Sequence, residues 1–164
     1  MKTNNHVLNM LVAGLLVGGC AGQTVQASGT QAAPVIRFAQ DVVNDEPVGT
    51  HCSTGVPAAG ADAKQFKMDG CGNDVATYVK FENVPSSTIV TLISEKSCDE
   101  SGARWWFNVR TFKHPTTSKW VDIRELKDIP NTVIVPGVMR TTGHYNYGNI
   151  KGKLSCAVIR SPHE

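Results

Sequence analysis

The chain has 164 residues, of which 41% are hydrophobic and 18% are charged, with 15 glycines and 8 prolines. This composition is typical of one globular domain, and it excludes collagen-like repeats, long coiled coils and a wholly disordered chain. The formal net charge is only +2, which gives no indication of a nucleic-acid-binding tail. No segment after residue 20 has the roughly 18 consecutive apolar residues that a membrane span needs.

The first 19 residues have the pattern of an export signal. A short polar start precedes a mostly apolar run at 7–19, which is too short to cross a bilayer. Residues 17–20 (VGGC) resemble the lipobox of bacterial lipoproteins, in which the cysteine, here Cys20, is acylated and becomes the first residue of the mature chain. A second cleavage site stays open, because Val25-Gln26-Ala27 has the small-x-small pattern of ordinary secretion.

Residues 20–33 predict a flexible tether ahead of one β-rich domain at 34–164. After Cys20 the segment is small, polar and uncharged, which suits a linker between a lipid and a folded domain. Ala21 follows the cysteine; by resemblance to enteric-type lipoproteins, which carry Asp there for inner-membrane retention, this favours the outer membrane. We therefore expect an outer-membrane lipoprotein that contacts the membrane through its N-terminal lipid only.

Four cysteines remain after either cleavage: Cys52, Cys71, Cys98 and Cys156. An even number in an exported chain predicts two disulfides. Of the three possible pairings we favour Cys52–Cys71, which closes a short Gly/Ala-rich loop, and Cys98–Cys156, which ties the middle of the domain to its last strand. Loops of roughly 20 and 60 residues would each stabilise the fold by about 3–4 kcal/mol. We expect no metal site, because no C-x-x-C occurs and only His51 neighbours a cysteine.

Short runs rich in alternating or β-branched residues predict an all-β fold, a β-sandwich or a small β-barrel. The expected strands are 34–38 as an edge strand, 75–82, 88–94, 104–112, 132–135 and 153–160. The runs 75–82 and 88–94 are expected to pair with each other across the turn at 84–87. A short helix is expected at 121–129, because apolar residues recur there at every third position before Pro130.

The aromatic strand at 104–112 presents two different faces. Trp105, Phe107 and Val109 share an uncharged face, which predicts the core side. Trp106 and Phe112 then flank Arg110 on the opposite, half-exposed face. Trp and Arg are the residue types that most often dominate binding energy, so we interpret this face as a partner-binding surface. The alternative is that the helix at 121–129 covers it and makes a second small core.

The segment 144–149 is polar and aromatic, and it adds His144, Tyr145 and Tyr147 to the candidate binding residues. Loops of this composition are typical of adaptable contact surfaces. The alternative is a simple hairpin turn set by Gly148 and Asn149.

Charge is divided unequally between the two halves of the domain. Residues 34–103 contain five basic and ten acidic residues, whereas 104–164 contain ten basic and four acidic. One interpretation is that the halves interleave in the sheets and neutralise each other. The other is that the domain has a basic face for an anionic partner.

Residues 98–105 (CDESGARW) resemble the Ser-Gly-x-x-Tyr element of the membrane-bound lysozyme inhibitors. Those proteins are small exported β-barrel lipoproteins that insert this loop into the lysozyme cleft. The match covers five residues, with Trp105 where the family has Tyr, and the rest of this domain is longer and lacks the family's other motifs. The resemblance implies an inhibitory contact carried by Ser101 and Arg104.

The sequence contains no G-x-S-x-G, H-E-x-x-H, P-loop or G-x-G-x-x-G motif. We therefore expect a non-catalytic binding protein of inhibitor or immunity type, without a cofactor and without nucleic-acid binding, whose partner is a protein or an anionic glycan. Two alternatives stay open. One is a released lectin-like or toxin-component protein cleaved after Ala27, and the other is a small envelope hydrolase that uses His114 or His144.

Overall fold

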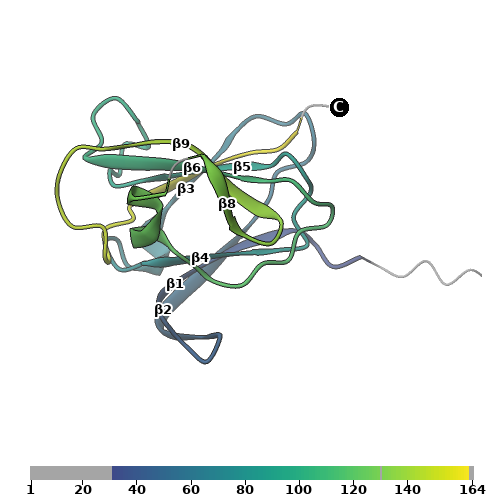
Figure 1. Ribbon diagram of the computed structural model, residues 1–164, viewed down its shortest axis with the longest axis horizontal. Coiled ribbons are helices and arrows are strands. Elements are labelled where there is room, and N and C mark those ends of the chain that lie inside the picture. The colour runs from purple at the N-terminus through teal and green to yellow at the C-terminus, as the bar shows by residue number, and fades with distance from the viewer. Residues whose placement is uncertain (1–30, 130, 163–164) are drawn as a thin grey trace, which may run out of the picture. The chain divides into compact units, whose positions relative to one another are not determined.

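The computed structural model describes residues 31–129 and 131–162. The predicted signal peptide at 1–19, the lipidation residue Cys20, the cleavage site at Ala27 and Pro130 lie outside these residues. The described part folds into two antiparallel sheets (Figure 1), which confirms the prediction of a disulfide-stabilised all-β sandwich. No helix within this part has the length and hydropathy needed to cross a membrane.

The four-stranded sheet has the order β2-β1-β4-β7. Its members are β1 (Val35–Val43), β2 (Glu46–Gly55), β4 (Tyr78–Glu82) and β7 (Val121–Asp122). The six-stranded sheet has the order β3-β10-β5-β6-β9-β8. Its members are β3 (Lys64–Lys67), β5 (Ile89–Ile93), β6 (Trp105–Thr111), β8 (Thr132–Val135), β9 (Val138–Tyr145) and β10 (Cys156–Arg160). Two short 3-10 helices complete the fold, η1 (Met68–Cys71) and η2 (Ile123–Lys127).

The core lies between the inner faces of the two sheets. Alternate residues of β4 and β6 are fully buried, as a strand with one buried face requires. The Trp105 ring stacks on the Phe107 ring, with 5.4 Å between the ring centroids. Burying an aliphatic or aromatic side chain of this size stabilises a fold by about 1.5–3 kcal/mol. The uncharged face of the aromatic strand is therefore the core side, as predicted.

Two predicted strand arrangements are wrong. The segment at 34–38 belongs to β1, which is not an edge strand, because β2 and β4 pair with it on either side. The predicted pair 75–82 and 88–94 does not form, because β4 and β5 lie in different sheets. The chain crosses between the sheets through the turn, where Val84 bridges to Thr116 and the Ser87 amide donates to the Thr111 carbonyl oxygen. Both strands bury one face in the same core. Their alternation alone therefore does not distinguish two strands paired in one sheet from two strands that face each other across the core.

The predicted helix forms as η2, a 3-10 helix preceded by the two-residue strand β7. The carboxylate of Asp122 accepts a hydrogen bond from the Arg124 amide and so caps its start. Ile123 and Leu126 are buried in the main core. The helix therefore packs on the core side of the sandwich, and it does not cover the face that carries Arg110.

Both predicted disulfides form. Cys52–Cys71 and Cys98–Cys156 have Cα–Cα distances of 5.5 Å and 5.4 Å, within the usual range for a disulfide. The second bond belongs to a small second cluster outside the main core, whose buried members are Ile93, Cys98, Cys156 and Val158.

Candidate functional site

The outward side of the six-stranded sheet, called here the outer face, is ordered in rows by the strand register. Ile89 of β5 lies between Arg160 of β10 and Arg110 of β6. Two residues along, Thr91 lies beside Asn108 of β6, and two residues further Ile93 lies beside Trp106. Because neighbouring strands are about 4.8 Å apart, the backbones of the two arginines are separated by about 10 Å.

The two arginines keep their charge available. Arg110 donates from Nη2 to the Ser87 hydroxyl at 2.9 Å, and Arg160 donates from Nη1 to the Thr91 hydroxyl at 2.9 Å. Neither forms an ion pair with another described residue. Neutral hydroxyls therefore orient both guanidinium groups without cancelling their charge, which leaves them suited to a carboxylate or phosphate group.

The middle of the outer face is polar. Asn108 donates from Nδ2 to the Thr142 hydroxyl at 2.9 Å, whereas its Oδ1 atom is buried and has no hydrogen-bond partner among residues 31–129 and 131–162. Thr91 beside it is fully buried. The Asn108 side chain is therefore fixed by Thr142, and its oxygen lies below the surface.

Trp106 lies between surface and core. It is half-buried because it packs with Ala103 against the second cluster around the Cys98–Cys156 disulfide. The alternative of a second small core is thus partly right. The loop between β5 and β6, which contains Cys98, forms this core together with the strands, whereas the helix η2 does not take part. Phe112 is 42% exposed at the other end of the strand, about 20 Å from Trp106 at about 3.3 Å per residue.

The predicted binding residues do not all share this face. Trp106 and Arg110 alternate outward along β6, Phe112 follows directly after the strand, and His144 pairs with Trp106 and is exposed. Tyr145 is the exception: it pairs with Trp105 on the core side, its hydroxyl donates to the Gly148 carbonyl oxygen at 2.8 Å, and the Lys127 Nζ atom lies 4.3 Å from its ring centroid.

The predicted loop at 144–149 is also shorter than expected. His144 and Tyr145 end strand β9, so the loop starts at Asn146, whose amide donates to the Arg104 carbonyl oxygen. Within it Tyr147 is 58% exposed. The sequence reasoning missed Arg160, although the alternation of the last strand places it on the same side as Cys156.

Charge distinguishes the two sheets. The six strands of the six-stranded sheet contain no Asp or Glu, and Lys67, Arg110 and Arg160 occupy outward positions. On the four-stranded sheet, cations are paired, as in Arg37 with Glu82 at 2.9 Å. The unequal charge of the two halves is therefore neutralised on one sheet and left uncompensated on the strands of the other.

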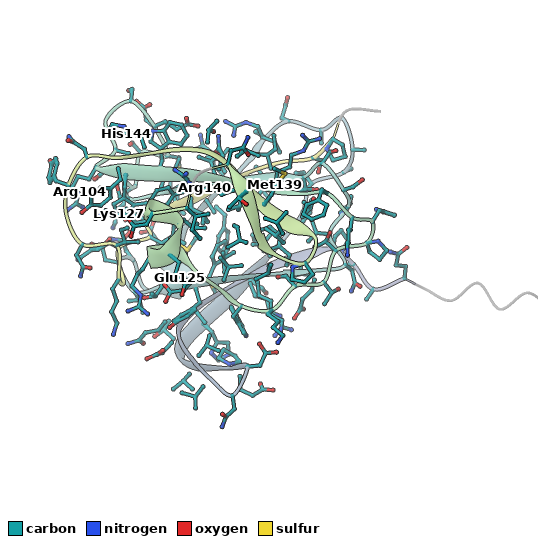
Figure 2. All side chains as sticks on the ribbon, viewed as in Figure 1. Arg104, Glu125, Lys127, Met139, Arg140 and His144 are labelled. Atoms are coloured by element: carbon teal, nitrogen blue, oxygen red, sulfur yellow. A yellow bond between two sulfur atoms is a disulfide. The ribbon has the colours of Figure 1, made fainter. Side chains whose placement is uncertain are left out.

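The loop between β5 and β6 lies at the Trp106 end of the outer face, near His144 (Figure 2). The amide and the hydroxyl of Ser101 each donate to the Asp99 carboxylate at 2.9 Å, and they hold the pKa of Asp99 below its ordinary value. Arg104 donates from Nε to Glu95 at 2.9 Å. The two residues singled out by the inhibitor resemblance are therefore held within the loop by neighbouring carboxylates.

The histidines lie apart from each other. His114 follows the C-terminal end of β6, whereas His144 pairs with its second residue. In the described part of the chain, neither ring hydrogen-bonds to a hydroxyl or a carboxylate, and no three His, Cys, Asp or Glu residues are grouped to hold a metal ion. Among the described residues, neither His114 nor His144 is therefore placed beside a hydroxyl that it could activate.

No protein-family model matches the chain, and no match was found among curated proteins or among solved structures.

Proposed function

We propose that this protein is a non-catalytic binding module of the bacterial cell envelope, which holds an acidic partner against the outer face of the six-stranded sheet. The observation that carries the proposal is the absence of acidic residues from all six strands, together with two arginines in one row that have no ion-pair partner among residues 31–129 and 131–162. Arg pairs with carboxylates and phosphates in a planar, bidentate geometry. The charge and its spacing therefore fit a partner with successive acidic groups.

The dimensions of this face favour a protein as the partner. Trp106 and Phe112 place apolar surface at the two ends of a strand about 20 Å long, with Arg110 between them. Aromatic and arginine anchors set among polar neighbours are typical of protein–protein interfaces. An anionic glycan is the second candidate, because the two arginines would also bind its carboxylates.

Site-specific photo-cross-linking tests this proposal. A benzoylphenylalanine at position 112 is a conservative replacement for an exposed phenylalanine, and the same group at Val43, which is 55% exposed on the other sheet, is the position control. In the native envelope we expect a cross-linked acidic protein from position 112 and not from position 43.

Charge reversal supplies the matched comparison. Arg110→Glu with Arg160→Glu should abolish the cross-link, whereas Lys119→Glu with Lys151→Glu changes the net charge equally at exposed positions away from the outer face. The melting temperature of both double variants controls for folding. Equal cross-linking by the two double variants would refute this site.

The cellular location is part of the proposal. The lipobox-like residues 17–20 and the uncharged tether support a lipid anchor at Cys20. The intact mass of the mature protein from membrane and culture medium tests it. Acylated protein beginning at Cys20 is expected in the membrane fraction, and lipid-free protein beginning at Ser28 in the medium would support the released alternative instead.

A further inference from the structure

A groove of about 250 Å³ lies on the outward side of the four-stranded sheet, away from the face proposed above. Its lining consists of two residues of β1, four residues of β2 and the tryptophan that precedes β7: Arg37, Phe38, Pro47, His51, Cys52, Ser53 and Trp120. The groove thus combines an aromatic side chain and a proline with three hydrogen-bonding side chains.

Trp120 is held in place before any ligand binds. Its indole N–H donates to the Asp45 carbonyl oxygen at 3.1 Å. The Lys80 ammonium lies 5.6 Å from the centroid of the indole ring and 3.4 Å from the Asp45 carboxylate. These contacts join Trp120 to the turn between β1 and β2, so that the indole forms a pre-organised wall of the groove.

The polar side chains retain hydrogen-bonding capacity. Arg37 and Ser53 are register partners on neighbouring strands, so their side chains project to the same side. Arg37 uses Nε to pair with Glu82 at 2.9 Å, and no hydrogen bond within the described residues uses its terminal nitrogens. His51 places Nδ1 3.1 Å from the Gly49 carbonyl oxygen, so in the tautomer that donates there its Nε2 atom accepts from a ligand.

The charges around the groove are balanced. Arg37 pairs with Glu82 and Lys80 pairs with Asp45, in contrast to the uncompensated arginines of the other sheet. The ligand that fits is therefore neutral. Its chemistry combines one apolar face for the indole with hydroxyl groups for the donors and acceptors beside it.

We propose that this groove binds one hexopyranose ring of a neutral saccharide, stacked on Trp120 and hydrogen-bonded to Arg37, His51 and Ser53. The volume lies just below the range of roughly 300–1,000 Å³ usual for pockets that hold drug-sized ligands, which suits one sugar ring. The site is independent of the outer face, since it lies on the other sheet and uses none of the same residues.

Fluorine NMR of the full chain labelled with 5-fluorotryptophan tests the assignment. The chain has three tryptophans, and Trp120→Phe identifies the Trp120 signal. Titration with glucose, galactose, mannose and N-acetylglucosamine should shift that signal saturably with at least one sugar, with a Kd on the order of 1 mM for so small a ligand. The signals of Trp105 and Trp106 should not move.

Variants that leave the indole in place distinguish binding from folding. Arg37→Gln and Ser53→Ala should each weaken the sugar about tenfold, whereas Lys151→Gln, an exposed control, should leave the Kd unchanged. Galacturonate, a charged sugar, is titrated for comparison. The proposal is overturned if none of the four neutral sugars shifts the Trp120 signal saturably, whether or not galacturonate does. It is also overturned if both groove variants bind as the unaltered protein does. Cross-linking at position 112 is a separate measurement, so failure at either site is distinguishable from failure at the other.

Discussion

Breaking the Cys98–Cys156 bond should destabilise the domain more than breaking Cys52–Cys71. The two bonds close loops with sequence separations of 58 and 19 residues. In the chain-entropy description these loops correspond to about 4 kcal/mol and about 3 kcal/mol of stabilisation. Each pair also contains a buried cysteine, since Cys156 is fully buried and Cys71 is 3% exposed, so replacing either pair with Ala leaves a gap that adds on the order of 1 kcal/mol.

Urea unfolding followed by far-UV circular dichroism measures this difference. We expect Cys98→Ala with Cys156→Ala to lower the free energy of unfolding by about 5 kcal/mol, and Cys52→Ala with Cys71→Ala to lower it by about 4 kcal/mol. The first variant should also shift the 5-fluorotryptophan signal of Trp106, because this side chain packs against that disulfide. An equal or larger loss from the Cys52–Cys71 variant would refute the ranking by loop length, and an unchanged Trp106 signal would refute the role of the second cluster.

Two further predictions concern β9 and the loop before β6. Gly143→Ala should lower stability by about 1–3 kcal/mol, since the added Cβ would lie 2.8 Å from Phe107 Cδ1; a thermal melt checks this, and an unchanged melting temperature would contradict it. Ser101→Ala should raise the pKa of Asp99 toward its ordinary value, because the alanine lacks the donating hydroxyl. The depressed pKa means that the Asp99–Ser101 contact stabilises the loop above the ordinary carboxyl pKa and is lost as the pH falls through the lowered one. An NMR titration of the Asp99 carboxyl measures the change, and identical titration in the two proteins would exclude the contact.

Strand β6 was predictable because its alternation is complete. Trp105, Phe107 and Val109 are buried, whereas the positions that alternate with them include the polar Asn108 and Arg110, so the charged face is the outward one. The disulfides were predictable for a related reason: loop length and the position of Cys156 in a strand favoured one of only three pairings.

Strands β2 and β9 were not predictable from periodicity. β2 (Glu46–Gly55) is an edge strand in which only Thr54 is buried, so its sequence shows no apolar alternation. β9 (Val138–Tyr145) contains Gly143, and its register with β6 shifts beside Asn108, which breaks the period of two. Tyr145 is therefore expected from the sequence in a loop, whereas it ends strand β9 beside Trp105.

The candidate site depends on strand order, which local patterns do not encode. Arg110 and Arg160 are fifty positions apart in the chain, and they share a row only because β6 and β10 flank β5 on its two sides. Most acidic residues of the first half lie in the four-stranded sheet or in loops, whereas β3 and β5, its two contributions to the six-stranded sheet, contain none. Interleaving the halves therefore does not mix their charges evenly. It places cations on the six-stranded sheet and ion pairs on the four-stranded sheet. For this reason we propose an acidic partner for the outer face and a neutral ligand for the groove beside Trp120.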